Sequence, residues 1–259
     1  MTPGATYSTS NQVAKITISR PEFKNALNQE TVKSLTEFFN KASSDSSVKA
    51  VIFSGAGTEA FCAGADLKEL QAAQGLSARR EFFSGIAELV KAISTCEKPV
   101  VAAVQGFALA GGCGLAAAAD IVLASEDAVF GLPEIKLGLL PMIVMAPIGR
   151  VIGVRALSEL VLTGEQIDAT RALQIGLITR IVPKAELLAE AEKTAATLAA
   201  KSSATLALGK KTIYELRDPE YLKSLDQLAE QVAKLSLTAD AAEGIKAFFE
   251  KRKPVWLSN

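Results

Sequence analysis

The stretch KPVVAAVQGFALAGGCGLAAAADIVLAS, residues 98–125, contains the features that decide the fold. Its two apolar runs, residues 100–104 and 121–124, have the length and composition of buried strands. Between them a pair of glycines at 111 and 112 precedes the small residues 113–119, which predicts a tight turn followed by a helix. The first turn of a helix has N–H groups without internal partners, and glycine leaves them uncovered. This junction can therefore hold a developing negative charge.

A second junction of the same kind lies upstream, in KAVIFSGAG and FCAGADLKEL, within residues 49–70. An apolar strand at 50–53 ends in two glycines, and the small residues 63–65 followed by Asp66 begin another helix. Each junction can offer one backbone N–H to a single oxygen. An acyl-transfer or enolate-forming enzyme needs two such donors on one oxygen, so the sequence predicts that chemistry.

Composition excludes several classes of site. The 259 residues include 28 basic and 28 acidic ones, so the net charge is zero and we expect no nucleic-acid partner. The chain has no histidine, which excludes Ser–His, Cys–His and His–metal sites. The three cysteines are odd in number and do not have the spacing of zinc ligands, so we expect no metal site. We also expect their thiols to be reduced, as in a cytoplasmic protein. With no histidine to activate it, Cys113 is expected to be a small buried residue rather than a nucleophile.

Membrane insertion and secretion are not expected. The beginning, MTPGATYSTSNQ, lacks the basic and apolar regions of a signal peptide. The longest apolar stretches, near residues 100–119 and 137–147, are interrupted by Gly, Gln and Pro, which argues against a membrane span.

Strands and helices are predicted to alternate up to residue 183. We expect a frayed start, strands at 13–19, 50–53, 100–104, 121–124, 128–131 and 177–182, and helices at 28–39, 79–94, 113–119, 142–152, 154–162 and 169–174. From residue 184 onward only helical periodicity remains. The prediction is an α/β core with a parallel sheet over residues 1–183, followed by a helical C-terminal region over 184–259.

Five collinear motifs resemble the crotonase (enoyl-CoA hydratase/isomerase) superfamily over about residues 12–254. They are RPEFKNALN, FCAGADLKEL, the stretch 98–125, FGLPEIKLGLLP and EGIKAFFEKRKP. The resemblance implies an α/β fold built as a spiral of repeated ββα units, with a helical C-terminal trimerisation region and homotrimers or homohexamers. It also implies an acyl-CoA thioester substrate and no cofactor, because coenzyme A is part of that substrate.

The resemblance further implies the residues of the site. The backbone N–H groups of Ala65 and Gly111 would hold the thioester oxygen, and Glu134 would be the acid/base. Apolar neighbours in residues 130–140 should disfavour the charged form of Glu134. Phe248 and Lys251 would come from a neighbouring subunit. The complete set implied to bind acyl-CoA is Lys24, Ala63, Asp66, Leu67, Lys68, Gly112, Gly114, Phe248 and Lys251.

The chain departs from the family pattern at two places. Hydratases have a second glutamate where this sequence has Gly114, and MIVMAP, residues 142–147, replaces a glycine-rich stretch. Gly114 cannot transfer a proton, whereas adding water across a double bond needs both a base and an acid. Asp120 and Glu126 remain open as substitute acids.

A single carboxylate is compatible with more than one reaction. We favour a hydratase acting on an unsaturated acyl-CoA, in which Glu134 both orients water and supplies the proton. A Δ3,Δ2-enoyl-CoA isomerase would move a proton between two carbons with the same group. An acyl-CoA decarboxylase would use the enolate site without a general base. A catalytically weak acyl-CoA or RNA binder would keep the fold alone, although the neutral charge argues against RNA.

Overall fold

Two β-sheets lie at the centre of the computed structural model, which describes residues 4–217 and 220–256. The larger has the strand order β1-β2-β3-β5-β7-β10 and the smaller has the order β4-β6-β8-β9. The strands are β1 Ala5–Ser10, β2 Val13–Ile18, β3 Ala50–Gly55, β4 Ala60–Cys62, β5 Val100–Val104, β6 Phe107–Leu109, β7 Ile121–Ser125, β8 Val129–Gly131, β9 Gln166–Asp168 and β10 Arg180–Val182.

Helices follow the strands in each part of the chain and continue alone after β10. The helices are η1 Pro21–Phe23, α1 Gln29–Ser44, α2 Leu67–Ala72, α3 Gly75–Thr95, α4 Gly111–Ala117, η2 Pro133–Leu137, α5 Met142–Val151, α6 Val154–Thr163, α7 Ala169–Gln174, η3 Lys184–Glu186, α8 Leu187–Ala199, α9 Ser203–Arg217, α10 Tyr221–Leu235 and α11 Ala239–Phe249. In the described ranges, no helix combines the length and apolar character that crossing a bilayer would require.

Three successive turns of the chain repeat one pattern. β3, β5 and β7 are parallel neighbours in the larger sheet, and β4, β6 and β8 are parallel neighbours in the smaller one. Each pair of strands is followed by a helical segment, which is α2 with α3, then α4, then η2 with α5. The predicted α/β fold of repeated ββα units with a helical C-terminal region is confirmed.

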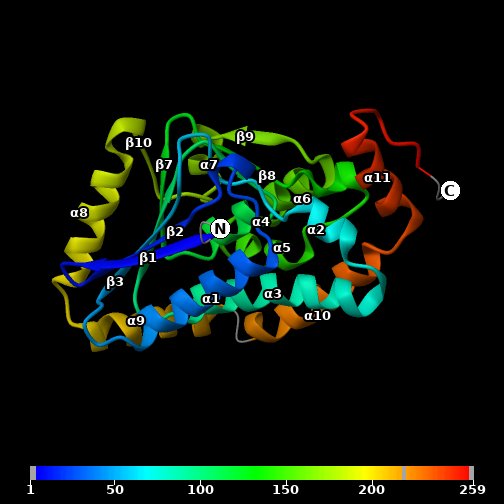
Figure 1. Cartoon of the computed structure of the whole chain (residues 1–259). Helices are drawn as coiled ribbons and strands as arrows, with labels where there is room; N and C mark the ends of the chain where they lie inside the picture. Colours follow the sequence, from blue (N-terminus) through cyan, green and yellow to red (C-terminus); the bar gives the residue numbers. More distant parts are fainter. Residues whose placement is uncertain (1–3, 218–219, 257–259) are drawn as a thin grey trace.

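Helices cover both faces of the larger sheet, which explains why its central strands are apolar throughout. Alternate residues of these strands, including Ile52 and Leu123, pack on α8 through Leu187 and Ala191. The intervening residues, including Phe53, belong to the main core under α1 and α3. Figure 1 shows α8 along one side of the sheet and α1, α3 and α10 side by side on another. The C-terminal helices thus pack on the core, and the division at residue 183 stays a prediction.

The N-terminal strand is a correction to the expected frayed start. β1 pairs with β2 in antiparallel register, through a two-residue turn in which Asn11 and Gln12 have φ of 50° and 65°. Such primed turns fit the twist of a hairpin. The alternation in ATYSTS is weak because most of β1 is exposed, with Ala5 buried at its start. The three-residue strands β4, β6 and β9 are too short for any periodicity and were not predicted.

Candidate active site

A cavity of about 410 Å³ lies where the three ββα units meet α10 and α11. Most of its wall is apolar, and Glu134 is the only acid among the described residues that line it. Of the residues expected in the site, those that line it are Ala63, Ala65, Leu67, Gly111, Glu134 and Phe248. The fold therefore gathers the two glycine-rich junctions and the PEI segment around one space.

The first backbone amide, that of Ala65, lies in the loop between β4 and α2. Gly64 has a φ of 100°, a left-handed conformation that favours glycine. A side chain there would meet the Cβ of Ala110 at 2.7 Å and come within 3.4 Å of the N atom of Gly111. The loop from β4 therefore lies directly against the loop that begins α4.

The second amide, that of Gly111, is the first N–H of α4. Ala110 precedes it with a φ of 52°, so the chain turns sharply out of β6. An added Cβ on Gly111 would lie 3.6 Å from the Cα of Gly64 and 3.9 Å from the N atom of Ala65. Within the part of the chain that the structure describes, neither the Ala65 nor the Gly111 N–H has a hydrogen-bond acceptor. The two donors thus lie close together beside the cavity.

Glu134 follows Pro133 in the first turn of η2. Its Oε2 atom is buried and has no partner among the described residues. Burial raises the pKa of Glu134 to about 8, because the apolar surroundings disfavour the carboxylate. η2 is held in place by α11, since Gly244 packs against the Leu137 carbonyl so closely that an added Cβ would lie 2.4 Å from that oxygen. This acid can both accept and release a proton near neutral pH.

Three lysines expected to bind coenzyme A are exposed and do not line the cavity. Lys24 lies over the Phe107 ring, 5.2 Å from its centre, and 4.0 Å from the Glu59 carboxylate. Lys68 is in the first turn of α2, and Lys251 follows α11. Phe248 lines its own chain's cavity, whereas the resemblance implied that it comes from a neighbouring subunit.

Asp66 does not turn its carboxylate toward the cavity. One oxygen accepts from the N–H groups of Lys68 and Glu69 and so caps α2. The other accepts from the Arg20 guanidinium at 3.1 Å. The side chain of Asp66 therefore holds the loop, and it is the backbone beside it that faces the cavity.

Gly112 and Gly114 are buried in α4 and do not line the cavity. A Cβ at Gly112 would lie 2.1 Å from the Cys62 carbonyl oxygen. A Cβ at Gly114 would lie 2.2 Å from the Cβ and 2.3 Å from the Cγ1 of Val144, which lines the cavity from α5. The place where a second glutamate would begin is therefore filled by Val144.

Neither substitute acid reaches the cavity. Asp120, which follows the C-terminal end of α4, pairs with the buried Lys210 at 2.8 Å and accepts from the Val100 N–H at 2.7 Å. Glu126 is exposed after β7. Cys113 is fully buried, and burial raises its pKa to about 12, so its thiol stays protonated and is not a nucleophile.

Further residues complete the wall. The sequence analysis did not place them in the site, except that Met142, Ile143 and Val144 belong to the MIVMAP stretch that departs from the family pattern. They are Leu70, Phe83, Ile86, Leu109, Ala110, Pro133, Lys136, Leu137, Leu139, Leu140, Pro141, Met142, Ile143, Val144, Gln166 and Val232. The helical periodicity of α3 marked Phe83 and Ile86 as buried but could not separate cavity wall from core. The same is true of Val232, which lies on the buried apolar face of α10.

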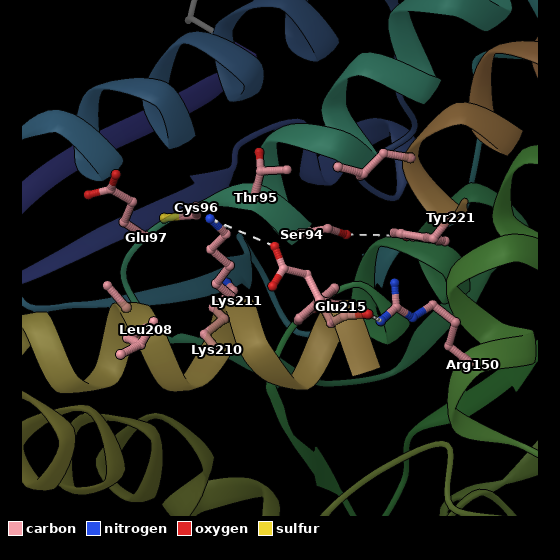
Figure 2. A pocket seen from close by; sticks show the side chains of 13 residues that line it. Ser94, Thr95, Cys96, Glu97, Arg150, Leu208, Lys210, Lys211, Glu215 and Tyr221 are labelled. Atoms are coloured by element: carbon pink, nitrogen blue, oxygen red, sulfur yellow. Dashed lines mark hydrogen bonds and ion pairs between the residues drawn. The ribbon is translucent and has the colours of Figure 1, made fainter. Parts of the chain in front are cut away.

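A second cavity, of about 570 Å³, lies between α9 and the end of α3 (Figure 2). The Arg150 guanidinium lies against the rings of both Tyr214 and Tyr221, 4.3 and 4.2 Å from the ring centres. Leu208 and Ile213 of α9 are each 66% exposed. None of the expected catalytic or acyl-CoA residues lines this cavity.

Known proteins resemble this chain along nearly its whole length. The sequence profile of the Enoyl-CoA hydratase/isomerase family matches residues 8–259. The mitochondrial enoyl-CoA hydratase domain-containing protein 3 of Rattus norvegicus is 38% identical over 94% of this chain and 81% of its own length. The short-chain-enoyl-CoA hydratase of Clostridium acetobutylicum is 35% identical over 93% of both. A crystal structure of an enoyl-CoA hydratase from Mycobacterium avium subsp. paratuberculosis, 31% identical, superposes with a TM-score of 0.88 and covers 98% of this chain and 99% of that one.

Proposed function

Because the chain belongs to the enoyl-CoA hydratase/isomerase family, we propose that it adds water to the double bond of a 2-enoyl-CoA thioester. The observation that carries the proposal is the position of Glu134, an acid with a raised pKa, in the same apolar cavity as two backbone N–H groups that have no acceptor among the described residues. The similarity of the chain to proteins named as enoyl-CoA hydratases supports the reaction class.

The amides of Ala65 and Gly111 hold the thioester oxygen in this proposal. When the oxygen of water bonds to C3, the electrons of the C2–C3 double bond move toward the thioester carbonyl, whose oxygen takes up the negative charge of an enolate. Donors that already point at the oxygen stabilise the enolate without reorganising, and one such donor is worth about 3 kcal/mol. The apolar wall strengthens both hydrogen bonds by excluding water.

Glu134 performs both proton transfers. As a carboxylate it takes a proton from the attacking water, and as an acid it gives that proton to C2 when the enolate collapses. A group that does both works best with a pKa near the working pH, which fits the value of about 8. The exposed lysines Lys24 and Lys68 would meet coenzyme A phosphates as point charges at the mouth of the site.

We also propose that the chain assembles as a homotrimer or homohexamer. The support is α9, whose apolar side chains Leu208 and Ile213 are each 66% exposed. Leu208 lies at the second cavity (Figure 2). Exposed apolar side chains of this size indicate that another surface covers this helix. Sedimentation at micromolar concentration would measure the assembly.

The test of the reaction uses two substrates. The purified protein is incubated with a 2-enoyl-CoA, and loss of the absorbance of the conjugated thioester reports hydration. A 3-enoyl-CoA is given separately, and gain of the same absorbance reports isomerisation. Hydration that disappears in Glu134→Gln supports the proposal. A wild-type enzyme that leaves the 2-enoyl-CoA unchanged at high concentration overturns it.

Isomerisation is the second candidate, and a specific observation favours it. Val144 fills the space beside Gly114, so among the described residues that line the cavity Glu134 is the only carboxylic acid. One carboxylate suffices to take a proton from C2 and return it to C4. Rapid conversion of the 3-enoyl-CoA, with no hydration, would select this reaction.

A further inference from the structure

Residues 20–29 and 63–69 lie side by side next to the cavity. The Ala63 N–H donates to the Lys24 carbonyl at 3.0 Å, the Leu27 N–H to the Gly64 carbonyl at 2.8 Å, and the Asp66 N–H to the Leu27 carbonyl at 2.9 Å. The two bonds made by Leu27 form a parallel bridge between Leu27 and Ala65. In such a bridge the groups flanking Ala65 are used, whereas its own N–H points the other way. The direction of that N–H is therefore set by how the two segments are held together.

Arg20 connects the two segments with its guanidinium. Nη1 donates to the Ala26 carbonyl at 2.5 Å, and Nη2 donates to Oδ2 of Asp66 at 3.1 Å. The Arg20 and Asp66 side chains are 13% and 18% exposed, so solvent screens this ion pair only partly. The contacts reach one residue before Leu27 and one residue after Ala65. A planar guanidinium holds two acceptors in a fixed relative geometry, whereas the compact ammonium of a lysine, on its flexible stem, does not fix them.

The backbone of Arg20 is itself anchored. Asn25 is completely buried and has a φ of 56°, a conformation that asparagine tolerates better than most residues. Its side chain accepts from the Arg20 N–H at 2.9 Å and donates to the carbonyls of Ala56 and Ala60 at 2.9 and 2.7 Å. The start of the Arg20 side chain is thereby fixed to the loop between β3 and β4.

We propose that Arg20 is a positioning residue, whose guanidinium joins the Ala26 carbonyl to the Asp66 carboxylate and so aims the N–H of Ala65 at the thioester oxygen. The inference rests on the proposed function, which gives that N–H its role. Ala65 has only a methyl group and cannot fix its own peptide plane. A hydrogen bond weakens steeply as its angle falls toward about 120°. Displacing a catalytic group by about 1 Å can cost roughly 100-fold in rate.

The test compares Arg20→Lys with Arg80→Lys as the matched control. Arg80 pairs with Glu230 on the surface between α3 and α10, away from the loop. The readout besides activity is the absorption of a bound 2,4-dienoyl-CoA, which moves to longer wavelength when the thioester oxygen accepts hydrogen bonds. Arg20→Lys should lose most of this shift and lower kcat about tenfold or more, with KM changed less than about threefold. Arg80→Lys should match the wild type in both.

Asp66→Asn provides a second variant, because asparagine still caps α2 but removes the charge that Arg20 meets. It should reproduce the effect of Arg20→Lys. The double variant should be no worse than either change alone, because both changes disrupt the same contact between Arg20 and Asp66. If Arg20→Lys fails to fold by circular dichroism, Asp66→Asn decides alone.

The outcomes separate this inference from the proposed reaction. A wild type that shifts the dienoyl absorption but hydrates nothing overturns the reaction and leaves the role of Arg20 intact. Folded variants that keep the full wild-type shift overturn the role of Arg20, whatever their activity. A wild type that binds the dienoyl-CoA without any shift overturns both the assigned amides and the positioning role.

Discussion

One methyl group added at Gly114 should destabilise the protein by about 3 kcal/mol, at the upper end of the usual cost of overpacking a core. The new Cβ would lie 2.2 Å from Val144 Cβ, 2.3 Å from Cγ1 and 3.1 Å from Cα. Ordinary contacts begin near 3.4 Å, so α4 and α5 would have to separate by about 1 Å in a region where Val144 is only 4% exposed.

Substitutions of Val144 distinguish which of its atoms cause the clash with a side chain at position 114. Val144→Ala keeps the Cβ and with it the 2.2 Å contact, so it should not rescue Gly114→Ala. Val144→Gly removes both shorter contacts and leaves only the 3.1 Å contact to Cα. By itself it should cost about 2–3 kcal/mol through lost burial and helix propensity. The double variant Gly114→Ala with Val144→Gly should lose about 2 kcal/mol less unfolding free energy than the sum of the two single losses. For Gly114→Ala with Val144→Ala, the two single losses should simply add.

Urea unfolding followed by circular dichroism measures these free energies, with all variants at one protein concentration because assembly adds to apparent stability. Gly114→Ala as stable as the wild type would refute the packing argument, and so would equal rescue by alanine and glycine at Val144. The contact with Val144 also limits whether a glutamate can be placed at position 114. Gly114→Glu alone should misfold, whereas Gly114→Glu with Val144→Gly should hydrate a 2-enoyl-CoA faster than Val144→Gly alone.

Three further predictions concern ionisable groups. In steady-state assays, kcat/KM for hydration should rise with pH through about 8 as Glu134 becomes a carboxylate, and Glu134→Gln should lose this inflection together with roughly 100-fold or more of the rate. The raised pKa also affects stability: the folded state favours the protonated acid, so its stabilising contribution is complete below the ordinary pKa of 4.5 and is lost as pH rises through about 8. The free energy of unfolding should therefore fall less between pH 5 and pH 9 in Glu134→Gln than in the wild type. Finally, Lys210→Met should cost about 3–5 kcal/mol in urea unfolding because it leaves Asp120 buried without its cation, and Asp120→Asn should recover part of that loss in the double variant.

The fold could be predicted wherever the chain carries a periodic pattern. α3 and α10 repeat apolar residues at helical spacing, and β5 is a continuous apolar run because helices cover both faces of its sheet. β1 could not be found this way, since most of it faces solvent. β4, β6 and β9 have three residues each, and their pairing depends on the spiral itself.

The residues of the candidate site could likewise be predicted from local sequence patterns, but their proximity could not. The small residues around Ala65 and Gly111, and the acid of the PEI segment, are visible in the sequence because each lies within a local pattern of strand, turn and helix start. Their proximity is not visible, because it depends on two loops 46 residues apart meeting through Gly64 and Ala110.

The absence of a glutamate at position 114 looks from the sequence like the loss of one catalytic group, and the structure gives it a packing reason. Val144 occupies the volume in which any side chain at Gly114 would begin, so the change on α4 and the bulky MIVMAP stretch on α5 belong to one contact. Two residues that depend on each other in this way must be changed together, and a single substitution at either cannot reveal what the site could do with a second acid. Room for a side chain at position 114 is therefore decided by a contact between α4 and α5 that the sequence of neither helix shows alone.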